Sequence, residues 1–185
     1  MLLKTITVTA LLAALHASAL PSPLPATPSL AAADDASLVL TDTRFLDDGG
    51  ILTIYSAHPA SSSSNTTTTS DSHLARRCGS NTVHCDGKHV PAFNTCTALV
   101  DRIRTSGAVL NASPRALCLN RSGKDCCISW GSDVGAVHES DLWSAAKATL
   151  DRCVPENNSG RATDVSINGR CIAQCLSDRA SGCRT

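Results

Sequence analysis

Two segments in the second half of the chain carry apolar residues at helical spacing. In the first, "AFNTCTALVDRIRTSG", four side chains recur at i, i+3, i+4 and i+7: Cys96, Leu99, Val100 and Ile103. This spacing places all four on one face of a helix. Asn94 is the expected N-cap of this helix, and Gly107 is the expected stop at its C-terminal end.

The second segment, "ESDLWSAAKATLDRC", repeats the pattern with six residues: Leu142, Ala145, Ala146, Thr149, Leu150 and Cys153. Ser140 is the expected N-cap. An apolar stripe of this width on a helix packs against a hydrophobic core. We therefore expect two core-facing helices, each tied down by a cysteine.

The segments between and after these helices have the pattern of strands joined by turns. "RALCL" and "CCISW" flank the polar stretch "NRSGKD", which predicts two strands and a turn. Further on, "ATDVSI" and "RCIAQC" flank Asn168-Gly169, a strong hairpin signal because both central positions must take a positive φ. The alternative is a short helix that carries Cys171 and Cys175 on one face, and the hairpin is slightly favoured.

A third hairpin is expected near the start of the chain, over residues 37–58. Apolar residues on both sides of the turn dipeptide Gly49-Gly50 indicate it: Leu38, Leu40, Phe45, Ile51, Ile54 and Tyr55. We interpret this hairpin as part of a pro-region, either a discarded tail or a pro-domain that docks on the cysteine domain before cleavage.

The segments around that hairpin are typical of an exported precursor. Residues 1–19 have a cation, an apolar run and an A-x-A motif, as in a secretory signal peptide cleaved after Ala19. Residues 20–36 are Pro/Ala-rich and expected to be extended, and residues 59–77 form a Ser/Thr-rich linker. The signal's apolar run is too short to span a bilayer, and no later segment is expected to span one.

The linker ends in the dibasic pair Arg76-Arg77, directly before Cys78. A processing protease of the kexin type could cleave there, because the pair follows a spacer and precedes the first cysteine. The alternative is an ordinary solvated loop. Residues 78–185 are the expected mature domain.

All ten cysteines lie in that domain: Cys78, Cys85, Cys96, Cys118, Cys126, Cys127, Cys153, Cys171, Cys175 and Cys183. In a secreted chain an even set of this density predicts a disulfide framework, here five bridges. The pairing stays open, with one limit. If Cys126 and Cys127 sit on a strand, they point to opposite faces and must bridge to different partners. The spacing does not match that of structural zinc sites.

These elements predict a small disulfide-stabilised α+β domain, with two helices packed on an antiparallel sheet. A hairpin-like leader segment and a flexible spacer are expected to precede it.

Candidate chemistry is sparse, and we expect no catalytic residues, no metal and no cofactor. Ser129 in "ISWGS" lacks the G-x-S-x-G elbow of a nucleophilic serine. Asp133, Glu139 and Asp141 lie around the start of the second helix, where acidic residues interact favourably with the helix dipole. The cluster "HCDGKH" contains the imidazoles of His84 and His89 and the carboxylate of Asp86, which are groups that can bind a metal. The same residues are also common in an ordinary surface loop.

Charge and aromatic content bear on the partners. From Cys78 onward there are twelve Lys and Arg against ten Asp and Glu, without the basic stripe that nucleic acid requires. Trp130 is expected in the core, and so is Trp143. Four sequons mark candidate N-glycosylation sites at Asn65, Asn111, Asn120 and Asn157, of which Asn120 in the polar turn is favoured.

The segments "DGGILTIY", "CCISWG" and "INGRCIAQCLSDRASGC" together resemble a family of small secreted fungal proteins with a "WD-like" domain. That family is not the β-propeller repeat family, and no repeat of about forty residues appears. The resemblance runs from about Asp48 to Cys183, interrupted by the linker. It implies a source and an export route rather than a reaction. A more distant similarity, in size and cysteine density only, is to fungal killer toxins and necrosis-inducing effectors.

The expected function is that of a secreted, non-enzymatic cysteine-rich binding module, effector-like, toxin-like or cell-wall-associated. Its expected partner is extracellular, on a host, a competitor or a cell wall, and the oligomeric state stays open. The alternative is a small secreted hydrolase with a carboxylate-based site.

Overall fold

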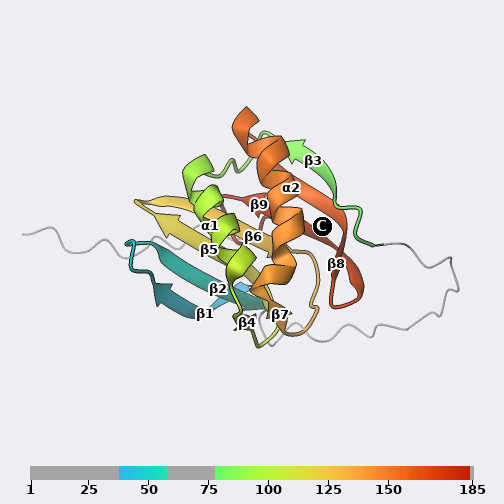
Figure 1. The fold of residues 1–185 in the computed structure, drawn as a ribbon, viewed down its shortest axis with the longest axis horizontal. Helices are drawn as coiled ribbons and strands as arrows, with labels where there is room; N and C mark the ends of the chain where they lie inside the picture. Colours follow the sequence, from blue (N-terminus) through green and yellow to red (C-terminus); the bar gives the residue numbers. More distant parts are fainter. Residues whose placement is uncertain (1–37, 58–77, 184–185) are drawn as a thin grey trace, which may run out of the picture. The chain divides into compact units, whose positions relative to one another are not determined.

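The structure is a computed structural model that describes residues 38–57 and 78–183 (Figure 1). Several predictions concern residues outside these ranges: the signal peptide with Ala19, the segment 20–36, the linker 59–77 with Arg76-Arg77, and the sequon at Asn65. Nine strands occur in the described ranges: β1 (Leu38–Phe45), β2 (Ile51–Ala57), β3 (Thr82–Asp86), β4 (Val109–Leu110), β5 (Pro114–Arg121), β6 (Lys124–Trp130), β7 (Val137–His138), β8 (Ser159–Ile167) and β9 (Arg170–Ser177). The helices are α1 (Phe93–Thr105), α2 (Trp143–Cys153) and the 3-10 turns η2 (Glu139–Leu142) and η3 (Val154–Glu156).

Seven of these strands form one antiparallel sheet in the order β1-β2-β5-β6-β9-β8-β3, and β4 pairs with β7 beside it. Strands make up 44% of the described residues and helices 25%. The expected α+β class, with helices packed on a sheet and a separate leader, is therefore wrong. The domain is mostly antiparallel sheet, because three strands without a clear alternating pattern (β3, β4 and β7) add to those expected.

The hairpin predicted over residues 37–58 is present as β1 and β2, and it belongs to this sheet rather than to a structurally separate segment. Strand β2 pairs with β5 in register from Ile51↔Asn120 to Ile54↔Leu117. Leu52 and Ile54 on β2 are buried in the same core as the helices. A separate segment was expected because residues 38–57 carry no cysteine and their contacts with β5 are distant in sequence.

Helix α1 buries the predicted stripe of Cys96, Leu99, Val100 and Ile103. The predicted N-cap is wrong. The helix begins at Phe93, so Asn94 lies within its first turn, and Ala92 is the N-cap without a side-chain hydrogen bond. Its last residue is Thr105 and its C-cap is Ser106, whose Oγ accepts a hydrogen bond from the Ala108 N–H at 3.2 Å. Gly107 directly follows the C-cap, in agreement with the predicted stop.

Helix α2 also buries its predicted stripe: Leu142, Ala145, Ala146, Thr149, Leu150 and Cys153. Ser140 is not its N-cap, because η2 precedes the helix and Leu142 takes that position. Both helices run side by side in Figure 1, and they contact β5, β6, β8 and β9 on one face of the sheet.

Two predicted hairpins are confirmed. Strands β5 and β6 are joined by the turn Ser122-Gly123, and β8 and β9 by Asn168-Gly169. The four turn residues all have a positive φ, between 49° and 74°. The alternative of a helix carrying Cys171 and Cys175 is excluded, because both lie on β9.

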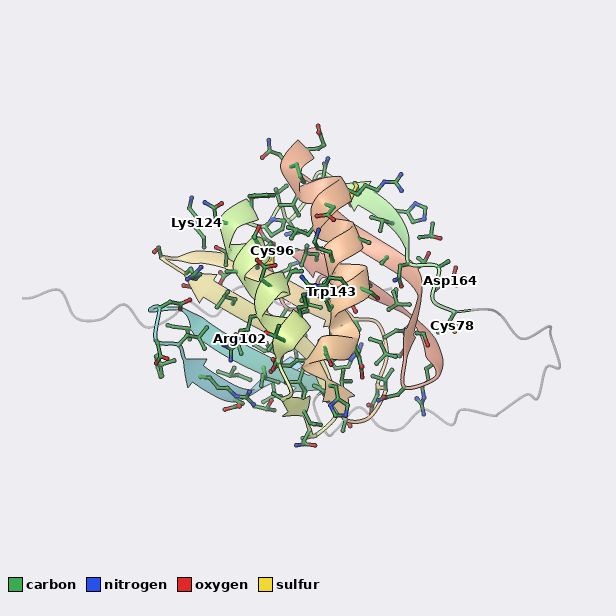
Figure 2. The ribbon with its side chains drawn as sticks, in the orientation of Figure 1. Cys78, Cys96, Arg102, Lys124, Trp143 and Asp164 are labelled. Atoms are coloured by element: carbon green, nitrogen blue, oxygen red, sulfur yellow. A yellow bond between two sulfur atoms is a disulfide. The ribbon has the colours of Figure 1, made fainter. Side chains whose placement is uncertain are left out.

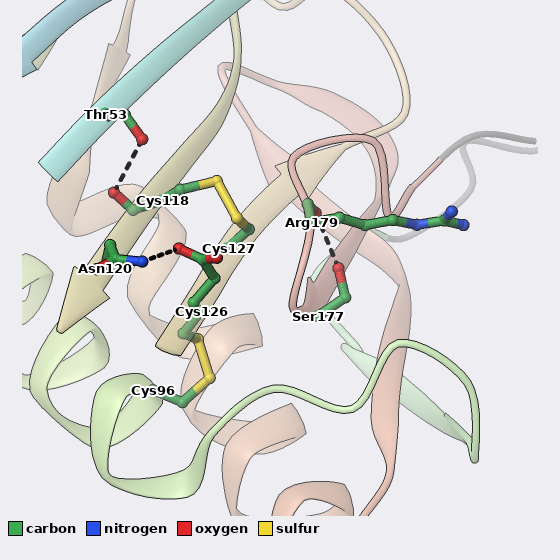
Figure 3. The surroundings of a disulfide bond; sticks show 9 residues. Thr53, Cys96, Cys118, Asn120, Cys126, Cys127, Ser177 and Arg179 are labelled. Atoms are coloured by element: carbon green, nitrogen blue, oxygen red, sulfur yellow. Dashed lines mark hydrogen bonds between the residues drawn. A yellow bond between two sulfur atoms is a disulfide. The ribbon is translucent and has the colours of Figure 1, made fainter. Parts of the chain in front are cut away.

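All ten cysteines are paired in five disulfides: Cys78–Cys171, Cys85–Cys153, Cys96–Cys126, Cys118–Cys127 and Cys175–Cys183. Figure 3 shows the adjacent cysteines of β6 diverging, Cys126 toward α1 and Cys127 toward β5. This confirms the prediction that they bridge to different partners. Figure 2 places Cys78 beside Asp164, whose carbonyl oxygen accepts a hydrogen bond from the Gly79 N–H.

Candidate functional site

The sheet has two chemically different faces. Because side chains alternate along a strand, Val83 and Cys85 of β3 point toward the helices, and His84 and Asp86 point the opposite way. The buried Val83 lies in the core, and Cys85 is bridged to Cys153 at the end of α2. The same alternation places the side chains that flank Gly160 and Ala162 on the opposite face, which no helix of the described residues covers (Figure 1).

A cavity of about 610 Å³ lies at the β3 end of that helix-free face. Strand residues form its floor: His84, Asp86, Ser159, Arg161, Cys175 and Ser177. The loop after β3 contributes Lys88 and His89, and the segment after β9 contributes Arg179 and Gly182. We call this the cationic cavity, because three Lys and Arg side chains line it against a single carboxylate, that of Asp86.

Hydrogen bonds fix the strand floor and the loop after β3. Ser159 Oγ donates to the Asp86 carbonyl oxygen at 3.1 Å. The Asp86 carboxylate accepts a hydrogen bond from the backbone N–H of Lys88 at 3.0 Å, and this bond closes the turn after β3. The hydroxyl of Ser159 and the carboxylate of Asp86 are thus already engaged within the protein.

The opposite wall is held to β9 by covalent and polar contacts. The Cys175–Cys183 disulfide closes the segment after β9 into a short loop. Ser177 Oγ donates to the Arg179 carbonyl oxygen at 3.0 Å, as Figure 3 shows. His89 Nδ1 lies 3.5 Å from an Asp178 carboxylate oxygen, so this loop also contacts the loop after β3.

The three cations of the cavity, Lys88, Arg161 and Arg179, differ in their surroundings. Within residues 38–57 and 78–183, the Lys88 ammonium and the Arg161 guanidinium have no hydrogen bond or ion pair. The Nε atom of Arg179 is buried and has no acceptor among the described atoms. A buried donor without an acceptor costs about 1–3 kcal/mol. The cavity therefore offers unused donors and an excess of positive charge.

The structure brings the predicted cluster of His84, Asp86 and His89 together at this cavity. In the part of the chain that the structure describes, no three His, Cys, Asp or Glu side chains are grouped so as to hold a metal ion. Sequence reasoning missed Arg161 and Arg179. The strand register places Arg161 directly opposite His84, a pairing that no local pattern reveals.

The carboxylates weighed for a hydrolase have different environments. Glu139 is 0% exposed, and its Oε1 lies 3.5 Å from Arg44 Nη1 of β1. Asp133 and Asp141 are exposed, and Asp133 Oδ1 accepts the Gly135 N–H at 2.8 Å. Ser129 is buried at 2% exposure. Neither Glu139 nor Ser129 is accessible to a substrate in this structure.

The remaining candidates lie apart from the cavity lining. Trp130 is buried, and Trp143 is half-buried with the Arg104 guanidinium 5.3 Å from its ring centroid. Of the described sequons, Asn111 and Asn157 are exposed. The favoured Asn120 lies on β5, and its Nδ2 donates to Asp125 Oδ1 at 2.8 Å (Figure 3).

A family model described as Fungal WD-like matches residues 53–183. The chain belongs to this family. The match begins within β2, so the Fungal WD-like region includes a strand of the N-terminal hairpin as well as the cysteine-bearing part. The structure shows a small cysteine-rich domain and not a propeller. No curated protein and no solved structure matches the chain.

No helix among the described residues combines the length and the apolar character needed to cross a membrane.

Proposed function

We propose that this Fungal WD-like protein is a secreted, non-enzymatic binding module that attaches to an extracellular surface, in the manner of an effector, a toxin or a cell-wall protein. The observation that carries the proposal is the cationic cavity, which combines fixed walls with donors that have no partner among residues 38–57 and 78–183. A preformed concave site with a few converging polar groups is typical of ligand binding. The disulfide framework supports an oxidising, extracellular setting.

The buried state of Glu139 supports binding over hydrolysis. A carboxylate that acts as general acid or base must reach the proton that it transfers, and the Glu139 side chain is closed off from solvent. The Asp133 carboxylate is engaged by a local backbone N–H. The proposal therefore places the activity of the protein in recognition by the cationic cavity.

The test uses the secreted, oxidised protein carrying a fluorescent label. It is incubated with plant, fungal and bacterial cells and with isolated wall polysaccharides. We expect saturable retention on at least one surface, and loss of retention after reduction and alkylation of the disulfides. Absence of retention on every surface would overturn the proposal.

A second arm addresses the hydrolase alternative. The same preparation is assayed for release of products from wall polysaccharides and peptides, alongside Asp133→Ala and Asp141→Ala. These two residues are exposed, so the substitutions are expected to leave the fold intact. Turnover by the parent protein that either alanine variant abolishes would replace the binding proposal with the hydrolase.

A further inference from the structure

We propose that the cationic cavity binds a tetrahedral oxyanion, a phosphate or sulfate group, either free or esterified to a sugar. This inference rests on the proposed binding function and specifies the chemistry of the ligand. It follows from the charges around the cavity, the directions from which the donors come, and the state of the other polar groups in the lining.

The charge balance of the lining favours an anion with two charges. Lys88, Arg161 and Arg179 contribute three positive charges, and Asp86 contributes one negative charge. Counting the Lys, Arg and Asp side chains of the lining, three positive charges against one negative give a formal net charge of +2. Clefts lined with charges of one sign concentrate ligands of the opposite sign. Inorganic sulfate carries two negative charges, and a phosphate monoester carries between one and two at pH 7, whereas a sulfate ester carries one.

The three cations belong to three separate segments of the chain. Arg161 lies on the sheet in β8, Lys88 lies in the loop after β3, and Arg179 lies in the loop closed by Cys175–Cys183. Donors around a cavity can each contact a different oxygen of a tetrahedral anion. A carboxylate has only two oxygens in one plane, so it can satisfy fewer of them. Guanidinium groups are well suited to phosphate because they bind two of its oxygens at once.

The other polar groups of the cavity leave the anion as the missing partner. The Ser159 and Ser177 hydroxyls donate to backbone carbonyls, and the Asp86 carboxylate accepts the Lys88 N–H. Among the cations of the lining, the exposed Lys88 ammonium and Arg161 guanidinium and the buried Arg179 Nε have no acceptor in the described residues. A cation would be repelled by these three charges, whereas an oxyanion attracts them and accepts their hydrogen bonds.

The test is isothermal titration calorimetry of the full secreted protein in a buffer free of phosphate and sulfate. The probes are inorganic phosphate, inorganic sulfate, a hexose 6-phosphate, a trimer of galacturonic acid and a neutral trisaccharide. We expect binding of phosphate, sulfate or the sugar phosphate that weakens as sodium chloride is raised. Of the two sources, tighter binding of the hexose 6-phosphate would indicate an esterified group, and equal binding a free anion.

Two variants and one control locate the site. Arg161→Gln is expected to weaken oxyanion binding by about tenfold or more, since a charge-assisted hydrogen bond is lost. Lys88→Gln is expected to weaken it several-fold. Arg152→Gln removes an exposed cation on α2, outside the cavity, and should leave binding within about twofold. Equal unfolding midpoints for the variants and the parent protein exclude loss of the fold as the cause.

The inference fails if neither phosphate, sulfate nor the sugar phosphate binds, if the galacturonic acid trimer binds more tightly than all three, or if Arg152→Gln and Arg161→Gln have equal effects. This outcome differs from failure of the proposed function. Surface retention that persists in Arg161→Gln would keep the binding function and remove the oxyanion. Oxyanion binding without retention on any surface would keep the oxyanion site and remove the proposed attachment to an extracellular surface.

Discussion

The N-terminal hairpin is expected to unfold together with the cysteine-bearing part of the chain, and a leucine pair within the hairpin tests this. Leu52 on β2 is 0% exposed, whereas Leu40 on β1 is 51% exposed. Replacing a fully buried leucine by alanine costs about 2–5 kcal/mol, because transfer energy is lost and a cavity remains. The same change at Leu40 should cost less than about 0.5 kcal/mol.

The measurement is urea unfolding of the oxidised protein, followed by the fluorescence of its two tryptophans. Trp130 is buried in β6 at 1% exposure, and β6 is separated from the hairpin by β5, so its signal reports on the cysteine-bearing part. A loss of ~3 kcal/mol corresponds to a fall of about 10 °C in Tm for a domain of this size. Leu119→Ala on β5, at 1% exposure, is the comparison within the cysteine-bearing part.

The reasoning is refuted if Leu52→Ala leaves the Trp130 transition unchanged while Leu119→Ala lowers it. The hairpin would then fold and unfold on its own, as a leader does. Equal losses for Leu52→Ala and Leu119→Ala, with Leu40→Ala near the parent protein, place β2 in the same cooperative unit as β5.

Two further substitutions test close packing and the buried carboxylate. Gly160→Ala is expected to destabilise the fold by about 1–3 kcal/mol, because its Cβ would lie 2.5 Å from Thr149 Cγ2. Gly107→Ala, which meets no atom within 4 Å, should leave the urea midpoint unchanged, and equal effects would contradict the packing argument. Arg44→Gln is expected to lower stability by about 1–3 kcal/mol, since it removes the cation beside the buried Glu139. Adding Glu139→Gln to Arg44→Gln should restore part of the lost stability. If the stability losses of the two single variants simply add in the double variant, the two side chains are not coupled.

Local periodicity was enough to predict the helical faces and the tight hairpins. The stripe from Cys96 to Ile103 is buried as expected, and Asn168-Gly169 forms the turn that its positive φ values require. Both features depend on residues within about eight positions of each other. The helix ends were predicted less well, because tertiary contacts fix them. Before α2, the Glu139 N–H donates to the Ala108 carbonyl oxygen, and the turn that follows takes the place of a side-chain cap at Ser140.

Strand order across the sheet could not be read from the sequence. Strand β3 is short, and four of its five residues are exposed, so it lacks the alternation that marks a strand. Its place at the sheet edge comes from pairing with β8, more than seventy residues away. The cationic cavity depends on that pairing. The cluster "HCDGKH" was visible as a local group, but Arg161 and Arg179 join it only through the folded sheet.

The position of β2 in the sheet changes the meaning of the dibasic pair at Arg76-Arg77. Cleavage there stays a prediction, but a discarded pro-region is difficult to reconcile with the fold. Removing the hairpin would expose the edge of β5 and take Leu52 and Ile54 out of the core. It would also leave the buried Glu139 without its cation. Because no cysteine precedes Cys78, a cut after Arg77 would leave two chains held by strand pairing and packing alone. We therefore expect the hairpin to stay with the cysteine-bearing part, whether or not the linker is cut.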